Sequence, residues 1–326
     1  MKQKISSLTQ ISIVVPLFNE DESLPELVDW ISRVMNTHGF SYEIVLVDDG
    51  SHDNSWSVIE SMSDSYPIKG IKFNRNYGKS AALNVGFKHC KGEVVITMDA
   101  DLQDSPDEIP ELYEMIKSGN HLVSGWKKKR FDPISKTIPS KFFNRVTRIL
   151  SGIKLHDFNC GLKAYDAKLV KTLDIYGEMH RYIPVIAKRN GFSKITEKVV
   201  EHRARKYGHT KFGLERFVYG FLDLLSISFV SKYRKRPMHF FGTLGSLSFL
   251  VGLFSVVGIV WEKIRSIYIL KSSDYRDVVD QPLFFLALTA IILGSQLFLA
   301  GFIGEMMVMN SHKDHDYILD ETIGLE

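Results

Sequence analysis

The first hundred residues repeat one pattern four times: a short apolar run, a few polar residues, and a stretch with apolar side chains at helical spacing. In the first helical stretch, for example, Leu24, Leu27, Val28 and Ile31 fall on one side. Pro16 should end the first strand. Alternating strands and helices predict a mostly parallel sheet covered by helices, which is the α/β class. The expected strands are Ile11–Val15, Tyr42–Val47, Gly70–Phe73 and Val94–Met98, and the expected helices are Leu24–Met35, Ser55–Met62 and Ser80–His89.

Polar residues follow the carboxyl end of each expected strand. In a parallel sheet these ends share one edge, and ligands of open α/β sheets bind in the crevice at that edge. One such cluster could be a surface loop, but four clusters in the same relation to four strands indicate a binding site. The clusters are Asn19–Glu20, Asp48–Asp49, Asn74–Lys79 and Asp99–Gln103.

The fourth cluster carries the strongest chemical signal. Asp99, Asp101 and Gln103 alternate along the chain, so their oxygens would project to one side if the strand geometry continued. Neighbouring carboxylates repel unless a cation or proton lies between them, and Mg²⁺ typically takes one or two carboxylates together with phosphate oxygens. The residues therefore favour a divalent-metal site facing a phosphorylated substrate, with a solvated acidic turn as the alternative.

Beyond residue 236 the sequence changes character. The overall composition is that of a soluble protein, with a net charge of +3 and a mean hydropathy of −0.05. Met238–Trp261 and Pro282–Gly304, however, contain no Asp, Glu, Lys or Arg, and each can cross a hydrocarbon core of about 30 Å as a helix. Two such runs side by side predict a membrane domain with two spans rather than a pair of buried core helices.

The charges beside these runs favour two spans in the inner (cytoplasmic) membrane, with the domain before them and both termini in the cytoplasm. Arg234–Arg236 precedes the first run, as the positive-inside rule asks, although the loop between the runs is also basic. The polar segment Met1–Gln10 leads directly into a strand, so no signal peptide is expected. The two cysteines, Cys90 and Cys160, lack metal-ligand spacing and fit a reducing compartment.

Four of the strand-end segments form an ordered set. They read Val15-Pro-Leu-Phe-Asn-Glu20, Val47-Asp-Asp-Gly-Ser51, Asn76-Tyr-Gly-Lys79 and Asp99-Ala-Asp-Leu-Gln103. The set resembles the family 2 glycosyltransferases of GT-A fold, whose sheet is Rossmann-like. Within them it is similar to the polyprenyl-phosphate hexosyltransferases, such as dolichol-phosphate mannosyltransferases and bactoprenol glucosyltransferases. The two-span tail resembles the bactoprenol glucosyltransferase subgroup.

The resemblance implies a role for each strand-end residue. Asp99, Asp101 and Gln103 would hold Mg²⁺ or Mn²⁺ on the diphosphate, where the metal acts as a Lewis acid on the leaving nucleotide. For Glu20 and Asp48, capping or turn chemistry is the alternative. The implied nucleotide-binding residues are Pro16, Asn19, Glu20, Asp48, Asp49, Asn76, Lys79 and Asp99.

A basic stretch follows the predicted metal site. His121–Arg148 holds eight Lys or Arg residues and one acid. Such a run is usually a solvated face, and no nucleic-acid recognition module accompanies it, so nucleic acid is not an expected partner. Beside a membrane anchor, the run favours attraction to anionic lipid headgroups or to a lipid phosphate. The family carries an Arg shortly after the position of Gly125, where this chain has Lys127, so the resemblance implies Arg130 and Ser140 as acceptor-phosphate residues.

Two further segments extend the resemblance. His156–Asp166 is similar to the family's Asp-x-x-x-Gly-x-(Arg/Lys) element, in which Asp157 would face the acceptor. A lipid phosphate is mostly a dianion at pH 7, so Asp157 could position the acceptor instead of removing a proton. Arg205 and Lys211 match an Arg-x-x-Gly-x-(Ser/Thr)-Lys element that would gather phosphates. The implied catalytic residues are Asp99, Asp101 and Asp157.

The expected protein is an enzyme that transfers one hexose, with inversion, from a UDP- or GDP-linked sugar to polyprenyl (undecaprenyl) phosphate. The tail favours UDP-glucose as donor, while mannose, N-acetylglucosamine and aminoarabinose remain open. The alternatives are a processive polysaccharide synthase, whose Gln-x-x-Arg-Trp element is missing, a flippase, which would need intramembrane charge, and a nucleotide-binding regulator. The expected organisation is a GT-A domain at 1–211, interfacial helices at 212–236, a two-helix membrane domain at 237–310 with glycine faces for pairing or oligomers, and a cytoplasmic tail at 311–326.

Overall fold

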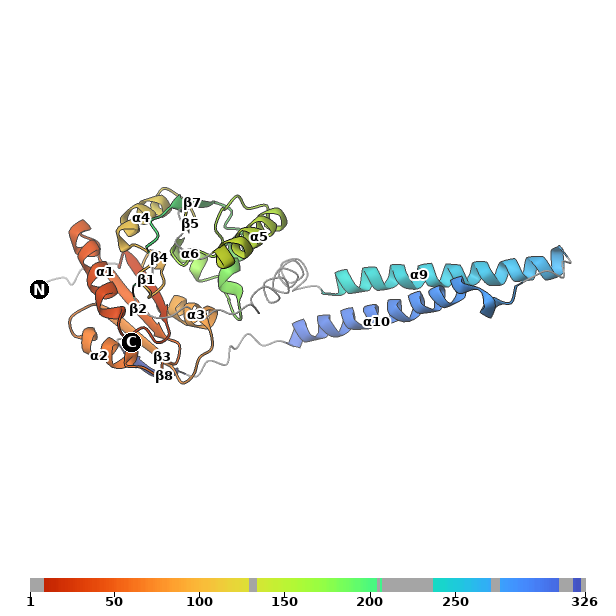
Figure 1. Ribbon diagram of the computed structural model, residues 1–326, viewed down its shortest axis with the longest axis horizontal. Coiled ribbons are helices and arrows are strands. Elements are labelled where there is room, and N and C mark those ends of the chain that lie inside the picture. Colours follow the sequence, from red (N-terminus) through yellow and green to blue (C-terminus); the bar gives the residue numbers. More distant parts are fainter. Residues whose placement is uncertain are drawn as a thin grey trace, which may run out of the picture. The chain divides into compact units, whose positions relative to one another are not determined.

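The computed structural model describes residues 9–128, 134–203, 206, 237–270, 276–310 and 319–323. The chain forms two compact units: the expected catalytic unit, built on one sheet that includes the C-terminal strand, and a helical hairpin (Figure 1). The predicted interfacial helices at 212–236 lie outside the described residues, as do Arg130, Arg205 and Lys211.

Eight strands form the sheet in the order β7-β5-β6-β4-β1-β2-β3-β8. The first four strands pair in parallel, as do β5 and β7. β6 runs antiparallel between β4 and β5, and β8 is antiparallel to β3. The mostly parallel sheet confirms the predicted α/β class and its first four strands. The strands are β1 (Ile11–Leu17), β2 (Tyr42–Asp48), β3 (Ile68–Phe73), β4 (Val94–Thr97), β5 (Leu122–Trp126), β6 (Lys163–Asp166), β7 (Ile195–Val199) and β8 (Leu319–Ile323).

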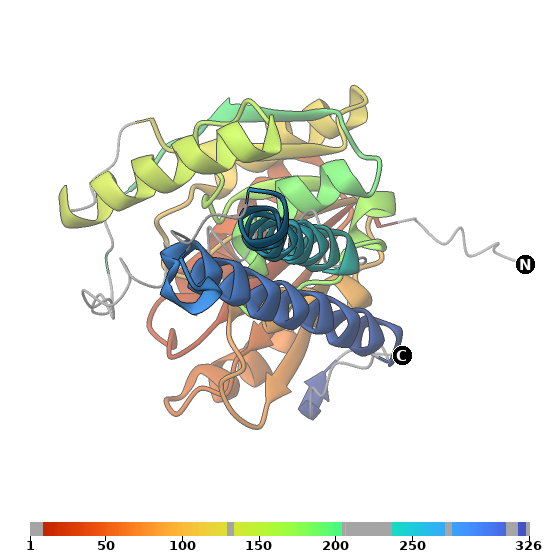
Figure 2. The same ribbon diagram turned by 90° about the vertical axis from the view of Figure 1, so that its right-hand side faces the viewer.

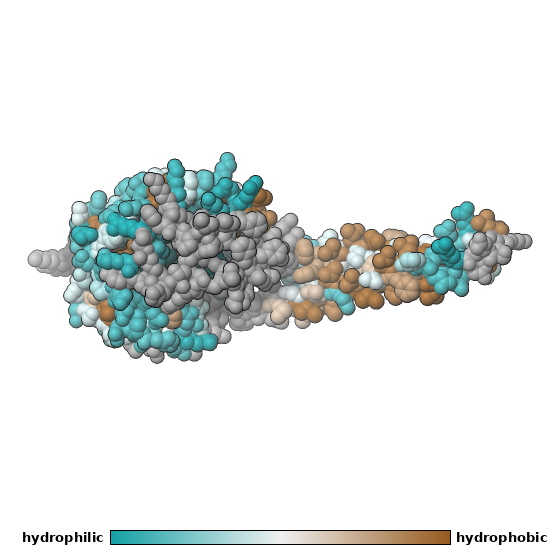
Figure 3. Space-filling view, viewed as in Figure 1, coloured by the Kyte–Doolittle hydropathy of each residue, from teal (hydrophilic) through white to brown (hydrophobic). Residues whose placement is uncertain are grey.

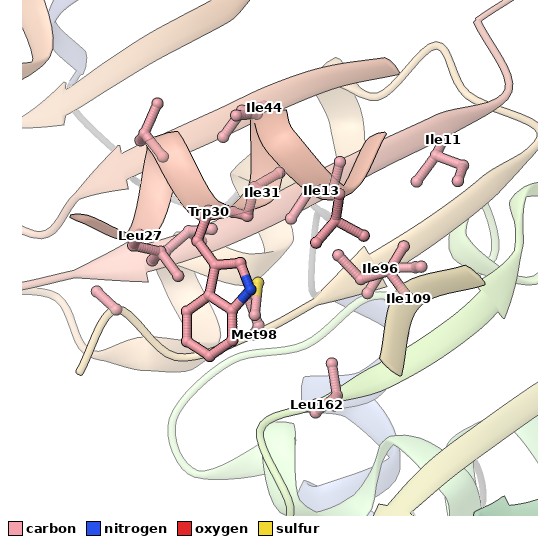
Figure 4. Close-up of a cluster of buried hydrophobic side chains, with 14 of the residues drawn as sticks. Ile11, Ile13, Leu27, Trp30, Ile31, Ile44, Ile96, Met98, Ile109 and Leu162 are labelled. Carbon is pink, nitrogen blue, oxygen red and sulfur yellow. The ribbon is translucent and has the colours of Figure 1, made fainter. Parts of the chain in front are cut away.

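Both faces of the sheet are buried. Ile11 and Ile13 of β1 pack with Ile31 of α1 in one hydrophobic cluster (Figure 4), whereas Val14 packs in a second cluster with Val85 of α3. This alternation follows from the two-residue period of a strand, and it makes the apolar runs nearly continuous. Among its described residues, the helices of the unit are α1 (Leu24–His38), α2 (Ser55–Ser63), α3 (Lys79–His89), α4 (Ile109–Lys117), α5 (Ile134–Ser151), α6 (Ala167–Val170) and α7 (Ile183–Arg189), with 3₁₀ turns η1 (Pro106–Glu108) and η2 (Met179–Tyr182).

The prediction that Pro16 ends the first strand is wrong, because β1 continues to Leu17 and Pro16 lies opposite Val47 of β2. On its other side β1 pairs with β4 only as far as Val14. The missing N–H of Pro16 therefore breaks no ladder on that side, and a proline is tolerated where a strand has a free edge.

The second unit is a hairpin of α9 (Pro237–Ile264) and α10 (Pro282–Asn310). Pro237–Ile269 and Pro282–Met307 are long and apolar enough to cross a membrane, and most of their residues are exposed. Apolar side chains cover the hairpin, and hydrophilic residues gather where the two helices are joined (Figure 3). The predicted spans thus appear as two candidate transmembrane helices.

Glycines let the two helices of the hairpin approach closely. A Cβ on Gly245 would lie 2.6 Å from the carbonyl oxygen of Gly294, and a Cβ on Gly252 would lie 2.6 Å from that of Ala287. At the open end, Glu305 of α10 accepts a hydrogen bond from the backbone N–H of Met238 at 3.2 Å. The glycine faces therefore serve pairing within the hairpin, which is one of the two uses that the sequence left open.

The segment predicted as a cytoplasmic tail contributes a strand to the sheet. In β8, Thr322 lies opposite Ile71 and Glu321 opposite Lys72. The order of the sheet makes β3 an edge strand without β8, and an unpaired edge exposes a row of unsatisfied N–H and C=O groups. The catalytic unit is thus completed by residues that follow the hairpin in sequence.

Candidate active site

The acidic cluster after β4 lies on a tight turn. The strand ends at Thr97, one residue earlier than predicted, and the extended geometry that would align Asp99, Asp101 and Gln103 does not continue. Leu102 adopts φ +59°, a left-handed conformation that is rare for a bulky side chain, and the backbone N–H of Gln103 donates to Asp101 Oδ1 at 3.2 Å. Strained backbone of this kind concentrates at functional sites.

Three lysines surround the carboxylate of Asp99. Burial opposes its ionisation, but Lys79, Lys127 and Lys163 outweigh burial and hold the pKa of Asp99 at about 2. Lys79, the first residue of α3, forms an ion pair with it. The chain also passes very close, because a Cβ on Gly161 would lie 2.5 Å from Asp99 Oδ2. Asp99 is therefore ionised at any physiological pH and held from two sides.

The donor atoms at this turn suit a hard divalent cation. Asp99 and Asp101 offer carboxylate oxygens and Gln103 an amide oxygen, which are the ligand types that Mg²⁺ and Mn²⁺ prefer. No group of three or more His, Cys, Asp or Glu residues that could hold a metal occurs among the described residues. Two carboxylates fit a metal that completes its shell with substrate phosphates, and the Lys79 ammonium already shows that Asp99 accepts a cation.

The loops after β2 and β3 are joined through Asp49. Its Oδ1 accepts a hydrogen bond from the backbone N–H of Tyr77 at 2.7 Å, and its Oδ2 accepts one from Gly78 at 2.9 Å. The neighbouring Asp48 is fully buried and accepts from the Ser51 N–H at 2.8 Å. Burial raises the pKa of both carboxyls, that of Asp49 to about 6. Asp48 thus shows the turn chemistry that was the alternative to nucleotide binding, and Asp49 clamps the Asn74–Lys79 loop.

The loop after β1 is tied to the loop after β2 in the same way. Asn19, at φ +54°, accepts a hydrogen bond from the His52 N–H at 2.9 Å and donates its own N–H to Ser51 Oγ at 2.9 Å. Glu20 accepts a hydrogen bond from Ser23 Oγ at 3.0 Å. The strand-end loops of β1, β2 and β3 therefore form one hydrogen-bonded rim along the edge that also carries Asp99, as predicted. Pro16 and Asn76 lie on this rim, half-buried and exposed respectively.

Lys127 is part of the interior of the site and not of its surface. Its ammonium lies 2.7 Å from Oδ1 of Asp104, which is fully buried directly behind the acidic turn. Burial lowers the pKa of Lys127, but the nearby carboxylates of Asp104 and Asp99 raise it well above its ordinary value. Lys127 is thus paired inside the protein, and Arg130, which the resemblance implied for the acceptor phosphate, lies outside the described residues.

Asp157 lies deep in the loop between α5 and β6. It is 1% exposed, its Oδ1 accepts the N–H of Asn159 at 3.0 Å, and its backbone carbonyl accepts from Ser124 Oγ of β5 at 3.1 Å. Lys163, the first residue of β6, is buried, which lowers its pKa, while the nearby charges of Asp157 and Asp99 raise it. Ser140 on α5 is half-buried. Asp157 and Asp99 therefore both lie close enough to one buried lysine to act on its charge.

Residues 12–174, half of the chain, match the model of the family described as "Glycosyl transferase family 2". The chain belongs to glycosyl transferase family 2. It is 33% identical over 310 residues to a dodecaprenyl-phosphate galacturonate synthase of Rhizobium johnstonii, covering 94% of this chain and 89% of the relative. It is 34% identical to an undecaprenyl-phosphate 4-deoxy-4-formamido-L-arabinose transferase of Shewanella sediminis, covering 90% of this chain and 86% of the relative.

The fold is also found among solved structures. Glucosyl-3-phosphoglycerate synthase of Mycobacterium tuberculosis, solved with Mn²⁺, UDP-glucose and phosphoglyceric acid, superposes with a TM-score of 0.54 at 18% identity over 68% of this chain and 79% of that chain. These comparisons confirm the predicted GT-A fold, the glycosyltransferase class and the polyprenyl-phosphate type of relative.

Three features of this family 2 site were not assigned a role from the sequence. Gly161 and Lys163 lie in the Asp-x-x-x-Gly-x-(Arg/Lys) element, and only the fold shows that they touch the surroundings of Asp99. Ser80 joins η2 to α3, because its Oγ lies 3.0 Å from both the backbone nitrogen and Nδ1 of His180. No local pattern marks this contact, since the two residues are a hundred positions apart.

The buried pair behind the turn gives a stability prediction. Lys127→Ala should lower the free energy of unfolding by about 3–5 kcal/mol, because it leaves the carboxylate of Asp104 buried without a counter-charge. Lys117→Ala is the matched control: its pair with Glu93 is exposed, and its loss should cost about 0–1 kcal/mol. Thermal unfolding of the purified variants measures both, and equal costs would show that Asp104 is not held by Lys127.

Proposed function

We propose that this family 2 glycosyltransferase transfers one sugar from a nucleotide sugar to a polyprenyl phosphate in a membrane. The observation that carries the proposal is that relatives with this activity in their names align over nine-tenths of the chain, including both candidate spans. The four polar strand-end loops on one sheet edge supply the donor side of such a reaction, and the hairpin supplies an anchor beside the lipid acceptor.

We assign one group of residues to binding of the nucleotide-sugar donor and another to the acceptor side of the site. The rim built on Asn19, Asp49 and the Asn74–Lys79 loop would hold the nucleotide, and Asp99, Asp101 and Gln103 would hold a divalent metal that stabilises the departing diphosphate. Asp157 is buried and accepts a backbone N–H, which suits a residue that positions the acceptor side of the site more than a general base exposed to it. The lipid phosphate is already a nucleophilic dianion and needs little help in losing a proton.

For the sugar, the relatives support a different choice from the glucose that the tail favoured. Their names give galacturonate and 4-deoxy-4-formamido-L-arabinose. We infer a donor of this pentose or uronic acid kind, carried on UDP because structural neighbours were solved with UDP and UDP-glucose. Glucose, mannose and N-acetylglucosamine are the comparison donors for the assay below.

The returning strand supports a topology for the membrane domain. β8 follows both candidate spans and pairs with β3 in the catalytic unit, so the chain must come back to the side on which that unit lies. Two crossings satisfy this requirement and one does not. With a cytosolic nucleotide sugar, the catalytic unit and β8 would be cytoplasmic, and the segment joining α9 to α10 would lie on the far side.

A transfer assay tests the function directly. Purified full-length protein, Mn²⁺ and undecaprenyl phosphate are incubated with radiolabelled UDP-galacturonate, UDP-4-deoxy-4-formamido-L-arabinose, UDP-glucose, GDP-mannose and UDP-N-acetylglucosamine in turn, and the lipid is extracted. Label should enter the lipid from one of the first two donors. Label from UDP-glucose alone would overturn the sugar assignment, and no labelled lipid from any donor would overturn the acceptor assignment.

Donor binding should weaken in acid because of Asp49. Its pKa is raised to about 6 by burial, so the carboxyl gains a proton as the pH falls through 6 and gives up one of its two N–H partners in the loop after β3. Between pH 7.5 and pH 5 we expect the Kd of a UDP-sugar, whose diphosphate diester does not titrate in this range, to rise about threefold to tenfold. Calorimetry measures it.

Asp49→Asn is the control for this pH effect. The amide cannot ionise and offers only one acceptor oxygen, so this variant should bind weakly at both pH values and lose the dependence. A Kd that changes with pH to the same extent in Asp49→Asn would assign the effect to another group.

A further inference from the structure

The outer face of α5 combines exposed apolar side chains with positive charge. Ile149 is 72% exposed and Leu150 54% exposed, which makes them the most exposed large apolar side chains among the described residues of the catalytic unit. Lys141 and Arg145 are also exposed. We define the α5 outer face by these four residues together with the half-buried Val146.

The helical repeat places these five residues on the side of α5 that faces away from the protein. Lys141, Arg145 and Ile149 are spaced by four residues and form one stripe, and Val146 and Leu150 form the next. Asn144 and Thr147, on the opposite side, are buried. The outer face is therefore basic at Lys141 and Arg145 and apolar at Val146, Ile149 and Leu150, and such a combination of cations with apolar side chains is typical of helices that lie in a membrane interface.

The surroundings of this face are positive as well. The sequence of α5 contains no Asp or Glu, Lys154 is exposed just beyond its end, and Lys188 of α7 donates to the carbonyls of Ser151 and Gly152 at 2.9 and 3.3 Å. One exposed isoleucine needs no explanation, but adjacent apolar side chains within a basic field match an anionic lipid surface in both chemistry and charge.

We propose that the α5 outer face lies on the anionic surface of the bilayer that holds the hairpin. The inference rests on the proposed function for the presence of a lipid acceptor, and it adds which face of the catalytic unit meets the lipid. α5 is followed directly by the loop that carries Asp157, so contact of this helix with the bilayer brings the acceptor side of the site to the membrane surface. Ile149 and Leu150 would enter the headgroup region, and Lys141 and Arg145 would pair with lipid phosphates.

Site-specific fluorescence in lipid tests the contact. Ile149→Cys and, separately, Leu150→Cys are labelled with an environment-sensitive NBD dye in full-length protein, in nanodiscs of phosphatidylglycerol and phosphatidylcholine with or without doxyl-labelled lipid. All labelled variants also carry Cys90→Ser, because Cys90 is half-buried, whereas Cys160 is buried and should stay unlabelled. Ser61→Cys is the matched control: it is exposed on α2, which Figures 1 and 2 place on the side of the catalytic unit opposite α5.

We expect doxyl lipid to quench the dye at 149 and 150 and to leave the dye at 61 unchanged. The quenching should fall when phosphatidylglycerol is omitted, or when Lys141→Glu and Arg145→Glu are introduced together. Quenching at 149 and 150 no greater than at 61 would overturn the proposal. A dye at 149 that is shielded without quenching, and more so at higher protein concentration, would overturn it in favour of contact with a second copy.

A kinetic readout separates this inference from the proposed function. Ile149→Asp with Leu150→Asp should raise the KM for undecaprenyl phosphate in anionic nanodiscs about tenfold, and leave the KM for a short, detergent-soluble isoprenyl phosphate unchanged. Ser61→Asp should change neither constant. If the wild-type protein transfers no sugar, the proposed function fails while the quenching result still decides the contact; unchanged KM values in an active variant would count against the contact alone.

Discussion

Asp101→Ala should abolish sugar transfer while the protein remains folded. The carboxylate of Asp101 sits on the strained turn after β4, with Asp99 two residues before it, and together they would hold the divalent metal that neutralises charge on the departing nucleotide diphosphate. Loss of one carboxylate from a two-carboxylate site should lower kcat by about 10³-fold or more. The rate of lipid labelling measures this loss, and Mn²⁺ binding followed by electron paramagnetic resonance should weaken in parallel.

The control for this variant is Asp64→Ala, which removes an exposed carboxylate at the end of α2. It should keep wild-type activity and Mn²⁺ affinity. Asp101→Ala with near wild-type turnover and an unchanged melting temperature would contradict the metal assignment and move the site elsewhere.

Gly161→Ala should inactivate the enzyme, because the added methyl group would displace the carboxylate of Asp99. An alanine Cβ at this position would lie 2.5 Å from Oδ2 and 2.7 Å from Oδ1 of Asp99, distances at which one of the two groups must move. Because Asp99 is also held by Lys79, the movement would disturb both the proposed metal ligand and the lysine proposed to lie next to the nucleotide. A shift of about 1 Å in a catalytic group can cost about 10²-fold in rate, which is the expected fall in kcat.

Gly258→Ala is the matched control, since a Cβ there meets no atom within 4 Å and the substitution should leave activity unchanged. A melting curve accompanies both variants, so that inactivation of Gly161→Ala with a near-normal melting temperature can be assigned to the site. Full activity of Gly161→Ala would mean that Asp99 can move without loss and is not a metal ligand.

Much of the donor side was predictable because its signals are local. A parallel sheet puts the carboxyl ends of its strands on one edge, so apolar runs followed by Asp49, Lys79 or Asp99 already imply that these residues meet. The structure confirms the sheet and the meeting of the loops. The details near the turns were less predictable: β1 passes through Pro16 because its far edge is free there, and the Asp99–Gln103 segment bends because Leu102 is held in a left-handed conformation.

The two candidate spans could also be predicted from local sequence. An uncharged run as long as Pro282–Gly304 suits a hydrocarbon core whatever surrounds it, so composition alone marks both candidate spans. The pairing of residues 319–323 with β3 could not be predicted in this way. A five-residue segment does not show by its own sequence which strand it will pair with, and the free edge of β3 exists only in the folded sheet.

By itself, then, the sequence determined the class of fold, the first four strands, the two candidate spans and the polar residues at the strand ends, because each depends on neighbouring residues and on the two-residue and 3.6-residue periods. Only the tertiary structure decided which charges meet. It buried Lys127 against Asp104, brought Lys163 near both Asp99 and Asp157, placed Gly161 against Asp99 and returned β8 to the sheet. These contacts join residues far apart in the chain, and their energies depend on burial, which exists only once the protein has folded.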